Sequence, residues 1–361
     1  MLHVHLLQDF QRHCQLLAAR DNAGYRLEFE RLSDVGSDFS TRAGYLPANR
    51  EKNRYPHILP YDHCRVKLAR QNWESHLDYI NASYVPGGTS ERDFICTQGP
   101  LRSTQADFWR MVWEQNVHVI VMVTDCLEND RACPQVLCEQ YWPQDCAAQY
   151  DRVTVTPLFQ RHCENFTSTT LQLSQAGCPT ERKITHYYYR AWPDRGVPQD
   201  RAALYAFTLQ VRQHLDSDPH AGPAVVHCSA GVGRSGTFVA LLWLSWLCSR
   251  NIWPDVRGVV HNLRRHRMMM VQSLEQYIFI HTCLLHWMSK DVTRNGTRRG
   301  QTSRRTHEDR QTTQPCQARR PDRLEERQRL GPRNRGTVIH RLLPARLIRR
   351  LQPGFSAPWW R

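Results

Sequence analysis

Hydrophobic positions recur along the first 290 residues with two periods, one typical of strands and one typical of helices. Near-continuous apolar runs over 117–125 and 224–226 predict strands buried on both faces of a sheet. Apolar residues three and four apart predict helices over 104–116, 200–215, 234–249, 254–267 and 273–289. Because strands and helices are interleaved, the pattern indicates an α/β domain with a mixed sheet and helices on both faces.

Shorter segments complete this pattern. Residues 52–68 are expected to be a loop that leads into a strand. The remaining predicted strands are 78–85, 93–100, 136–143, 150–158, 166–174 and 182–192. Near the N-terminus, residues 9–32 predict two short helices broken near Asn22–Gly24, where helix-breaking residues interrupt the apolar spacing.

The pattern ends near residue 290. Residues 291–361 hold 18 arginines, no lysine and 6 acidic residues, whereas the first 290 residues hold 30 basic and 28 acidic residues. The net charge of +14 therefore comes almost entirely from this tail, which we expect to be disordered. A solvated tail is favoured over an arm that binds RNA or an acidic surface. The predicted organisation is a helical segment over 1–35, a catalytic domain over 36–290 and the tail.

Cysteine usage bears on the compartment. The 13 cysteines show no disulfide framework and no CxxC metal pattern, which favours reduced thiols in the cytoplasm and no metal or other cofactor. The N-terminus lacks the features of a signal peptide, and no run of about 18 apolar residues is present. Whether the chain derives from a longer membrane receptor is left open.

The candidate chemistry lies in VVHCSAGVGRSGTF, residues 225–238, between a predicted strand and a predicted helix. A glycine-rich turn at a helix N-terminus can point several N–H groups at a tetrahedral dianion. Arg234 would add a bidentate fork, and the positive potential favours the thiolate of Cys228. The alternative for an isolated C-x5-R spacing is a structural buried cysteine. The complete string favours phosphoryl transfer to sulfur.

This string resembles the signature of the classical protein tyrosine phosphatases, and the flanking chain resembles a receptor-type catalytic domain. The resemblance covers about residues 9–289 and implies a highly twisted mixed sheet flanked by helices. It implies that Cys228 is the nucleophile, that His227 holds the loop and lowers the thiol pKa, and that Ser235 assists departure of the thiolate. The implied phosphate-binding loop is Ser229, Ala230, Gly231, Val232, Gly233 and Arg234.

Three further segments match the family. WPDRGVP, which begins at Trp192, resembles its movable acid loop and implies that Asp194 is the general acid and then the general base; alone, the segment would be read as a turn. MVQSLEQ implies that Gln272 positions water with Gln276 as its companion. KNRY implies that Tyr55 stacks on the substrate ring and sets the depth of the pocket.

Other positions depart from the family pattern. His57 stands where an acidic or amide side chain usually binds the substrate backbone. The segment 126–143 resembles the loop whose glutamate, here Glu128, pairs with Arg234, but it carries about four extra residues around 132–135. Leu137 replaces a common basic residue in that loop. Met269 replaces a glycine found in some relatives and is expected to narrow the pocket mouth.

The expected activity is metal-independent hydrolysis of phosphotyrosine in proteins through a phosphocysteine intermediate. The expected partners are phosphotyrosyl proteins, with nucleic acid left as a minor alternative by the basic tail. A pseudophosphatase that binds phosphotyrosine without turnover is one rival. A phosphoinositide phosphatase is another, although Ser229, Ala230 and Val232 lack the added basic residues of lipid-specific loops.

Overall fold

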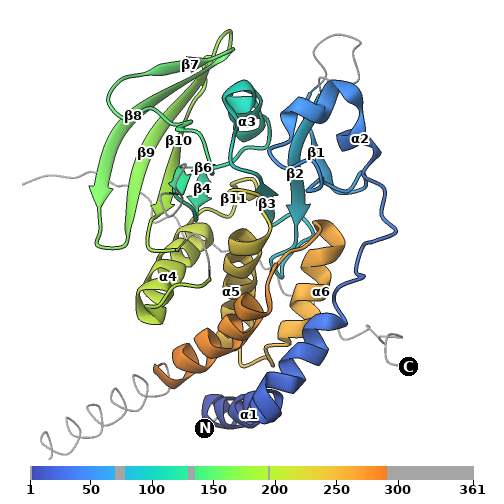
Figure 1. The fold of residues 1–361 in the computed structure, drawn as a ribbon. Helices are drawn as coiled ribbons and strands as arrows, with labels where there is room; N and C mark the ends of the chain where they lie inside the picture. The colour runs from blue at the N-terminus through green and yellow to red at the C-terminus, as the bar shows by residue number, and fades with distance from the viewer. Residues whose placement is uncertain (1, 70–77, 129–134, 194–195, 291–361) are drawn as a thin grey trace, which may run out of the picture. The chain divides into compact units, whose positions relative to one another are not determined.

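The computed structural model describes residues 2–69, 78–128, 135–193 and 196–290, all of which belong to one compact unit. Their centre is a nine-stranded sheet with the order β1-β2-β3-β11-β4-β10-β9-β8-β7 (Figure 1). The strands are β1 (Arg65–Lys67), β2 (Tyr79–Val85), β3 (Phe94–Thr97), β4 (Val119–Met122), β7 (Ala148–Tyr150), β8 (Val153–His162), β9 (Phe166–Gln175), β10 (Glu181–Tyr189) and β11 (Ala224–His227).

The sheet is mixed, as the sequence pattern predicts. β11 pairs in parallel with β3 and β4, and β4 pairs in parallel with β10, while the outer pairs are antiparallel. Val225 belongs to the hydrophobic cluster on one face of the sheet and Val226 to the cluster on the other. Both side chains are fully buried, which explains why this strand is apolar at consecutive positions.

Helices cover both faces. The apolar side chains of α3 (Gln105–Glu114) belong to the hydrophobic cluster that contains Val225. The cluster on the other face, which contains Val226, includes side chains of α5 (Gly233–Ser249), α6 (Val256–His266) and a helix over 274–290. α4 (Arg201–Ser217) lies beside α5 on that second face (Figure 1). Near β1 and β2 lie α2 (Arg42–Tyr45) and the short 3-10 helix η1 (Pro47–Lys52), and the 3-10 helix η3 (Arg102–Thr104) precedes α3. No helix within the described ranges is long and apolar enough to cross a bilayer.

The N-terminal segment is helical over α1 (Leu2–Glu30) but has non-helical dihedral angles from Ala19 to Asn22. The predicted pair of helices is therefore confirmed, with the break slightly earlier than the predicted one. Phe10 and Tyr25, one from each half, are buried in the cluster that contains α5 and α6.

One predicted strand is wrong. Residues 137–143 form no strand, and only β6 (Gln135–Val136) pairs there, with β5 (Leu127–Glu128). The apolar residues of this segment enter the core from a loop: Tyr141 is fully buried, and its carbonyl oxygen accepts a hydrogen bond from the Trp109 indole at 2.9 Å. Side-chain burial without regular backbone pairing produced the misleading pattern. The predicted tail, 291–361, lies outside the described residues.

Candidate active site

The centre of the candidate site is the turn from β11 into α5. Cys228 follows the last residue of β11, and α5 begins five residues later at Gly233. The positive end of the helix dipole thus faces the turn. Gly231 has φ +73°, and a Cβ there would collide with the carbonyl group of Thr97. Glycine is therefore required at this position both for its backbone conformation and for the close approach to β3.

A buried arginine that the sequence reasoning missed holds the outer side of this turn. Arg267 is fully buried, and its guanidinium donates to the carbonyl oxygens of Gly231 at 2.9 Å and Ala230 at 3.0 Å. It also donates to Asn81 Oδ1 at 2.8 Å and to Ser83 Oγ at 3.3 Å on β2. Because these carbonyls are drawn toward Arg267, the turn is anchored to the sheet from behind.

Cys228 is 5% exposed, and its sulfur accepts a hydrogen bond from the Gly231 N–H at 3.2 Å. Burial disfavours the thiolate. Against it, the Ser235 hydroxyl and the Arg234 charge, together with two backbone N–H groups, lower the pKa of the Cys228 thiol below its ordinary value. By contrast, burial raises the pKa of the neighbouring Cys96 thiol to about 12. The environment therefore favours ionisation of one of these two buried cysteines.

Ser235 and Arg234 lie on the first turn of α5. The Ser235 Oγ is buried and has no partner among the described groups other than the Cys228 sulfur, toward which its proton is available. Arg234 donates to Thr124 Oγ1 at 2.8 Å, which directs part of its fork toward the end of β4. Glu128 is buried in β5. Its pairing with Arg234 remains a prediction.

His227 is held in a buried chain of three side chains. Its Nε2 lies 2.7 Å from the Tyr141 hydroxyl, which lies 2.8 Å from Nε2 of His186. Its Nδ1 lies 3.2 Å from the carbonyl oxygen of Cys228. Burial lowers the pKa of His227 to about 4, so the ring is neutral near pH 7. A neutral ring contributes position rather than positive charge to the turn.

The turn opens into a cavity of about 300 Å³. Its lining brings together eight of the predicted site residues, Tyr55, Cys228, Ser229, Ala230, Gly233, Arg234, Gln272 and Gln276, and adds Ile58 and Leu137. The Tyr55 hydroxyl lies 2.8 Å from Ser229 Oγ, so this ring forms a wall that reaches the turn itself. Val232 is fully buried beneath the turn rather than in the lining.

Arg54, which the sequence reasoning also missed, fixes the position of Tyr55. Its guanidinium donates to three carbonyl oxygens, those of Gly99 at 3.1 Å, Pro100 at 2.9 Å and Val136 at 2.9 Å. Its own N–H donates to Gln98 Oε1 at 2.9 Å. The hydrogen bond to Val136 joins the segment that carries Tyr55 to the β5–β6 hairpin. Leu137, which follows Val136, lines the cavity.

The two glutamines lie against the start of α5. The Gln272 N–H donates to Gln276 Oε1 at 2.9 Å. A Cβ added at Gly233 would lie 3.1 Å from polar atoms of both side chains, so the glycine gives them room to approach. Arg264 supports this loop by donating to the carbonyls of Met270 at 3.0 Å and Val271 at 2.8 Å.

The predicted acid, Asp194, lies outside the described residues, but both flanks of its loop are described. Trp192 is 1% exposed and contacts Phe279 with ring centroids 6.3 Å apart. Gly196 has φ +87° and sits close to the carboxylate of Glu275, because a Cβ there would lie 3.2 Å from Oε1. Both flanks therefore approach the helix that follows the glutamine loop.

The departures from the family pattern fall around the rim. His57 is exposed and does not line the cavity, whereas the next residue does. Leu137 lines the cavity and is 6% exposed, so an apolar side chain stands where the family commonly has a basic residue. Met269 has φ 56° and is 42% exposed. Residues 129–134, which include part of the predicted insertion, lie outside the described residues.

Comparison with known proteins identifies the family of this chain. A protein-tyrosine phosphatase family model matches residues 49–286. The chain is 42% identical over 281 residues to receptor-type tyrosine-protein phosphatase V of Rattus norvegicus, covering 78% of this chain and 16% of that protein. It is 40% identical to receptor-type tyrosine-protein phosphatase eta of Homo sapiens, with 77% and 20% covered. It is also 40% identical to phosphatidylinositol phosphatase PTPRQ of Homo sapiens, with 78% and 12% covered. The chain thus spans a fifth or less of these three relatives.

Proposed function

Because the chain belongs to the protein-tyrosine phosphatase family, we propose that it hydrolyses phosphotyrosine in proteins through a phosphocysteine intermediate. The observation that carries the proposal is the environment of Cys228. Its thiol has a lowered pKa at the bottom of a cavity that also contains Arg234, Tyr55 and Gln272. These groups supply a nucleophile, an anion clamp, an aromatic wall and an amide in one cavity.

In the first step the Cys228 thiolate attacks phosphorus, so that a sulfur–phosphorus bond forms as the ester oxygen–phosphorus bond breaks. The N–H groups of the turn and the Arg234 fork hold the nonbridging oxygens, where negative charge is concentrated. Asp194, from the loop between Trp192 and Gly196, gives its proton to the leaving phenolate. The products of this step are tyrosine and phosphocysteine.

In the second step water attacks the same phosphorus and the sulfur departs as thiolate. The carboxylate of Asp194 takes the proton from water, and the side-chain amide of Gln272 orients that water. The Ser235 hydroxyl stabilises the departing thiolate, consistent with its lack of another described partner. Inorganic phosphate leaves, and the acid returns to its starting protonation state.

Substrate choice follows from depth and charge. A phosphotyrosine ring can reach the turn along Tyr55, whose hydroxyl already lies 2.8 Å from Ser229, whereas phosphoserine is too short to span the same wall. Leu137 and the uncharged turn residues add no positive charge at the rim for a polyanionic lipid headgroup. The relative named as a phosphatidylinositol phosphatase keeps lipid hydrolysis as the second candidate.

Turnover is tested with p-nitrophenyl phosphate. We expect vanadate-sensitive release of p-nitrophenol, which Cys228→Ser abolishes. Cys96→Ala is the matched control, because this thiol is equally buried on the neighbouring strand but has a raised pKa. Release that survives Cys228→Ser would refute the mechanism. Absence of any release would instead favour a binding protein without turnover.

The acid and the substrate class need a second experiment. Asp194→Ala should slow hydrolysis of a phosphotyrosyl peptide by about 10²–10⁴-fold while retaining its binding. Asp200→Ala, which removes only the N-terminal cap of α4, should keep the rate. A wild-type enzyme that releases phosphate faster from phosphoinositide vesicles than from the peptide would favour the lipid alternative.

A further inference from the structure

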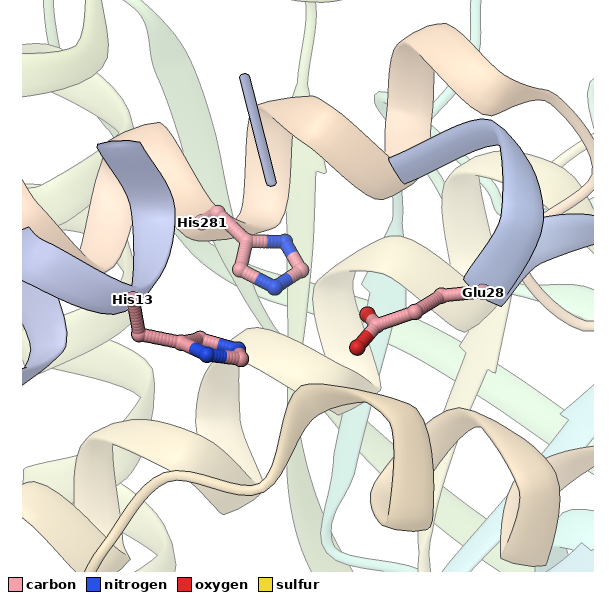
Figure 2. A group of neighbouring side chains, drawn as sticks. All are labelled: His13, Glu28 and His281. Atoms are coloured by element: carbon pink, nitrogen blue, oxygen red, sulfur yellow. The ribbon is translucent and has the colours of Figure 1, made fainter. Parts of the chain in front are cut away.

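Two histidines and a glutamate meet beyond the C-terminal end of α5, whereas the cavity lies at its N-terminal end. Within the described ranges, His13, Glu28 and His281 each offer a ligand atom, and these atoms all lie within 4.8 Å of one another. Figure 2 shows the three side chains converging on a common space between helices. His13 comes from the first half of α1, Glu28 from the second half and His281 from the helix over 274–290.

The break in α1 makes this meeting possible. Non-helical dihedral angles at Ala19–Asn22 reverse the chain, so residues 15 apart in sequence face the same space. The two halves of α1 and the helix over 274–290 enclose this space on three sides. The sequence reasoning predicted no metal, because these ligands are widely separated and have no CxxC-like spacing.

The ligand atoms are oriented by hydrogen bonds outside the cluster. His281 is 1% exposed, and its Nδ1 lies 3.0 Å from the carbonyl oxygen of Tyr277, a pure acceptor. The proton is therefore on Nδ1, which leaves the lone pair of Nε2 free to bind a metal. The Tyr277 hydroxyl also donates to Glu28 Oε2 at 2.7 Å. One residue thus orients two of the three ligands, as outer-shell partners do in metal sites.

The donor set selects the metal. Two imidazoles and one carboxylate are a common set of three ligands for Zn²⁺, which takes water as the fourth. Zinc–ligand bonds of about 2.0–2.1 Å place tetrahedral ligand atoms about 3.4 Å apart. The present separations of up to 4.8 Å would close by no more than about 1.4 Å. His13 and Glu28 are half-buried, which leaves a path for the ion and its water.

Aromatic rings pack against two of the three side chains of the cluster. Phe10 stacks on His281 with centroids 6.0 Å apart, and Trp253 meets His13 edge-on at 5.6 Å. Trp253 follows the C-terminal end of α5, whereas Cys228 precedes its N-terminal end. The 17-residue helix is about 25 Å long, so the cluster and the thiol are separate sites.

We propose that His13, Glu28 and His281 form a Zn²⁺ site that joins both halves of α1 to the helix over 274–290. That helix begins two residues after Gln272, so the ion stabilises the element next to the predicted water-positioning loop. The alternative is that the histidines only pack among the rings. Two observations argue against this alternative: the lone pair of His281 Nε2 points to the shared space, and the Tyr277 hydroxyl holds the Glu28 carboxylate beside it. Packing among rings requires neither.

The test uses the Cys228→Ser protein, because the reactive thiolate would otherwise bind Zn²⁺ itself. Calorimetry with ZnCl₂ should show one site per chain, and binding should raise the urea midpoint of unfolding. His13→Gln and Glu28→Gln should each weaken Zn²⁺ affinity at least tenfold. The matched controls His5→Gln and Glu30→Gln change exposed residues of the same helix and should leave affinity unchanged.

A second variant and a spectroscopic probe distinguish loss of this site from misfolding and from metal binding at another site. Tyr277→Phe retains the packing but loses the hydroxyl, and should weaken binding about tenfold. Co²⁺ in the same protein should show d–d bands without a thiolate charge-transfer band. Unchanged Zn²⁺ affinity in both His13→Gln and Glu28→Gln, or a thiolate band with Co²⁺, would overturn the proposal.

Discussion

Replacement of Arg267 by methionine tests how the turn behind Cys228 is held open for an anion. Arg267→Met keeps an unbranched apolar stem but removes every donor from a fully buried position. Four acceptors lose their partner: the carbonyls of Gly231 and Ala230 and the side chains of Asn81 and Ser83. The variant therefore separates the contribution of these hydrogen bonds from that of simple packing.

The expected loss of stability follows from those four acceptors. A buried acceptor left without a donor costs about 1 kcal/mol or more, which gives about 4 kcal/mol for the set. Part is regained because a charge is no longer buried. We expect a net loss of about 3 kcal/mol in the free energy of unfolding, which a domain stable by about 5–15 kcal/mol survives.

Arg267→Met should disturb the conformation of the turn, and with it the binding of an anion, more than it destabilises the fold. Once their carbonyls are free, the peptides at Ala230 and Gly231 can rotate, and their N–H groups then no longer converge on one anion. We expect vanadate affinity, measured by inhibition of p-nitrophenyl phosphate hydrolysis under folding conditions, to fall at least tenfold, or about 1.4 kcal/mol.

A control separates local from global effects. Leu173→Ala truncates a fully buried side chain in the hydrophobic cluster that does not contain Cys228, at a cost of about 2–5 kcal/mol. Urea unfolding should show comparable losses for the two variants, while vanadate affinity changes only for Arg267→Met. Equal vanadate affinity in both folded proteins would refute the role of Arg267 in shaping the turn.

Three further outcomes are expected. Ser235→Ala removes a hydroxyl that lowers the pKa of Cys228, so the pH profile of iodoacetate alkylation should shift to higher pH; an unshifted profile would contradict this. Gly231→Ala forces a collision with a backbone carbonyl, and should abolish vanadate binding while circular dichroism shows a folded chain. Burial lowers the pKa of His186 to about 3 and of His227 to about 4, so only the unfolded chain takes up their protons as the pH falls below about 6.5. Stability should therefore be full above that pH and fall by up to about 1.4 kcal/mol per pH unit per histidine toward about pH 4, which urea midpoints at pH 7 and 5 would reveal.

Most of the fold could be predicted, because its central strands and helices carry strong periodic patterns. β11 and α5 match their predicted ranges almost residue for residue. The segment 137–143 failed because Tyr141 and its neighbours are buried through side chains while their backbone pairs with no strand. Periodicity reports burial, and it cannot distinguish a strand from a loop that is equally buried.

The residues of the candidate site also divide into those that the sequence predicts and those that it does not. Cys228 and Arg234 are recognisable because a five-residue turn defines both their chemistry and their spacing. The roles of Arg54 and Arg267 are not recognisable, because each arginine donates to backbone carbonyls of distant segments. Every residue has a backbone carbonyl, so the sequence does not show which ones an arginine will contact. The sequence offers one signal for a structural arginine of this kind, namely an arginine among the apolar positions of a predicted helix. Arg264 is an example: it is buried, and a buried guanidinium needs several acceptors.

The chain of buried side chains behind Cys228 has a direction. The Cys228 carbonyl can only accept, so His227 carries its proton on Nδ1, and its Nε2 accepts from the Tyr141 hydroxyl. The Tyr141 oxygen must then accept from Nε2–H of His186, whose Nδ1 is a buried lone pair without a partner. Every proton points toward the nucleophile's peptide group, so the two imidazoles are opposite tautomers. Their aligned dipoles present a fixed positive end to that peptide, and ¹⁵N chemical shifts of the two rings would record this polarity.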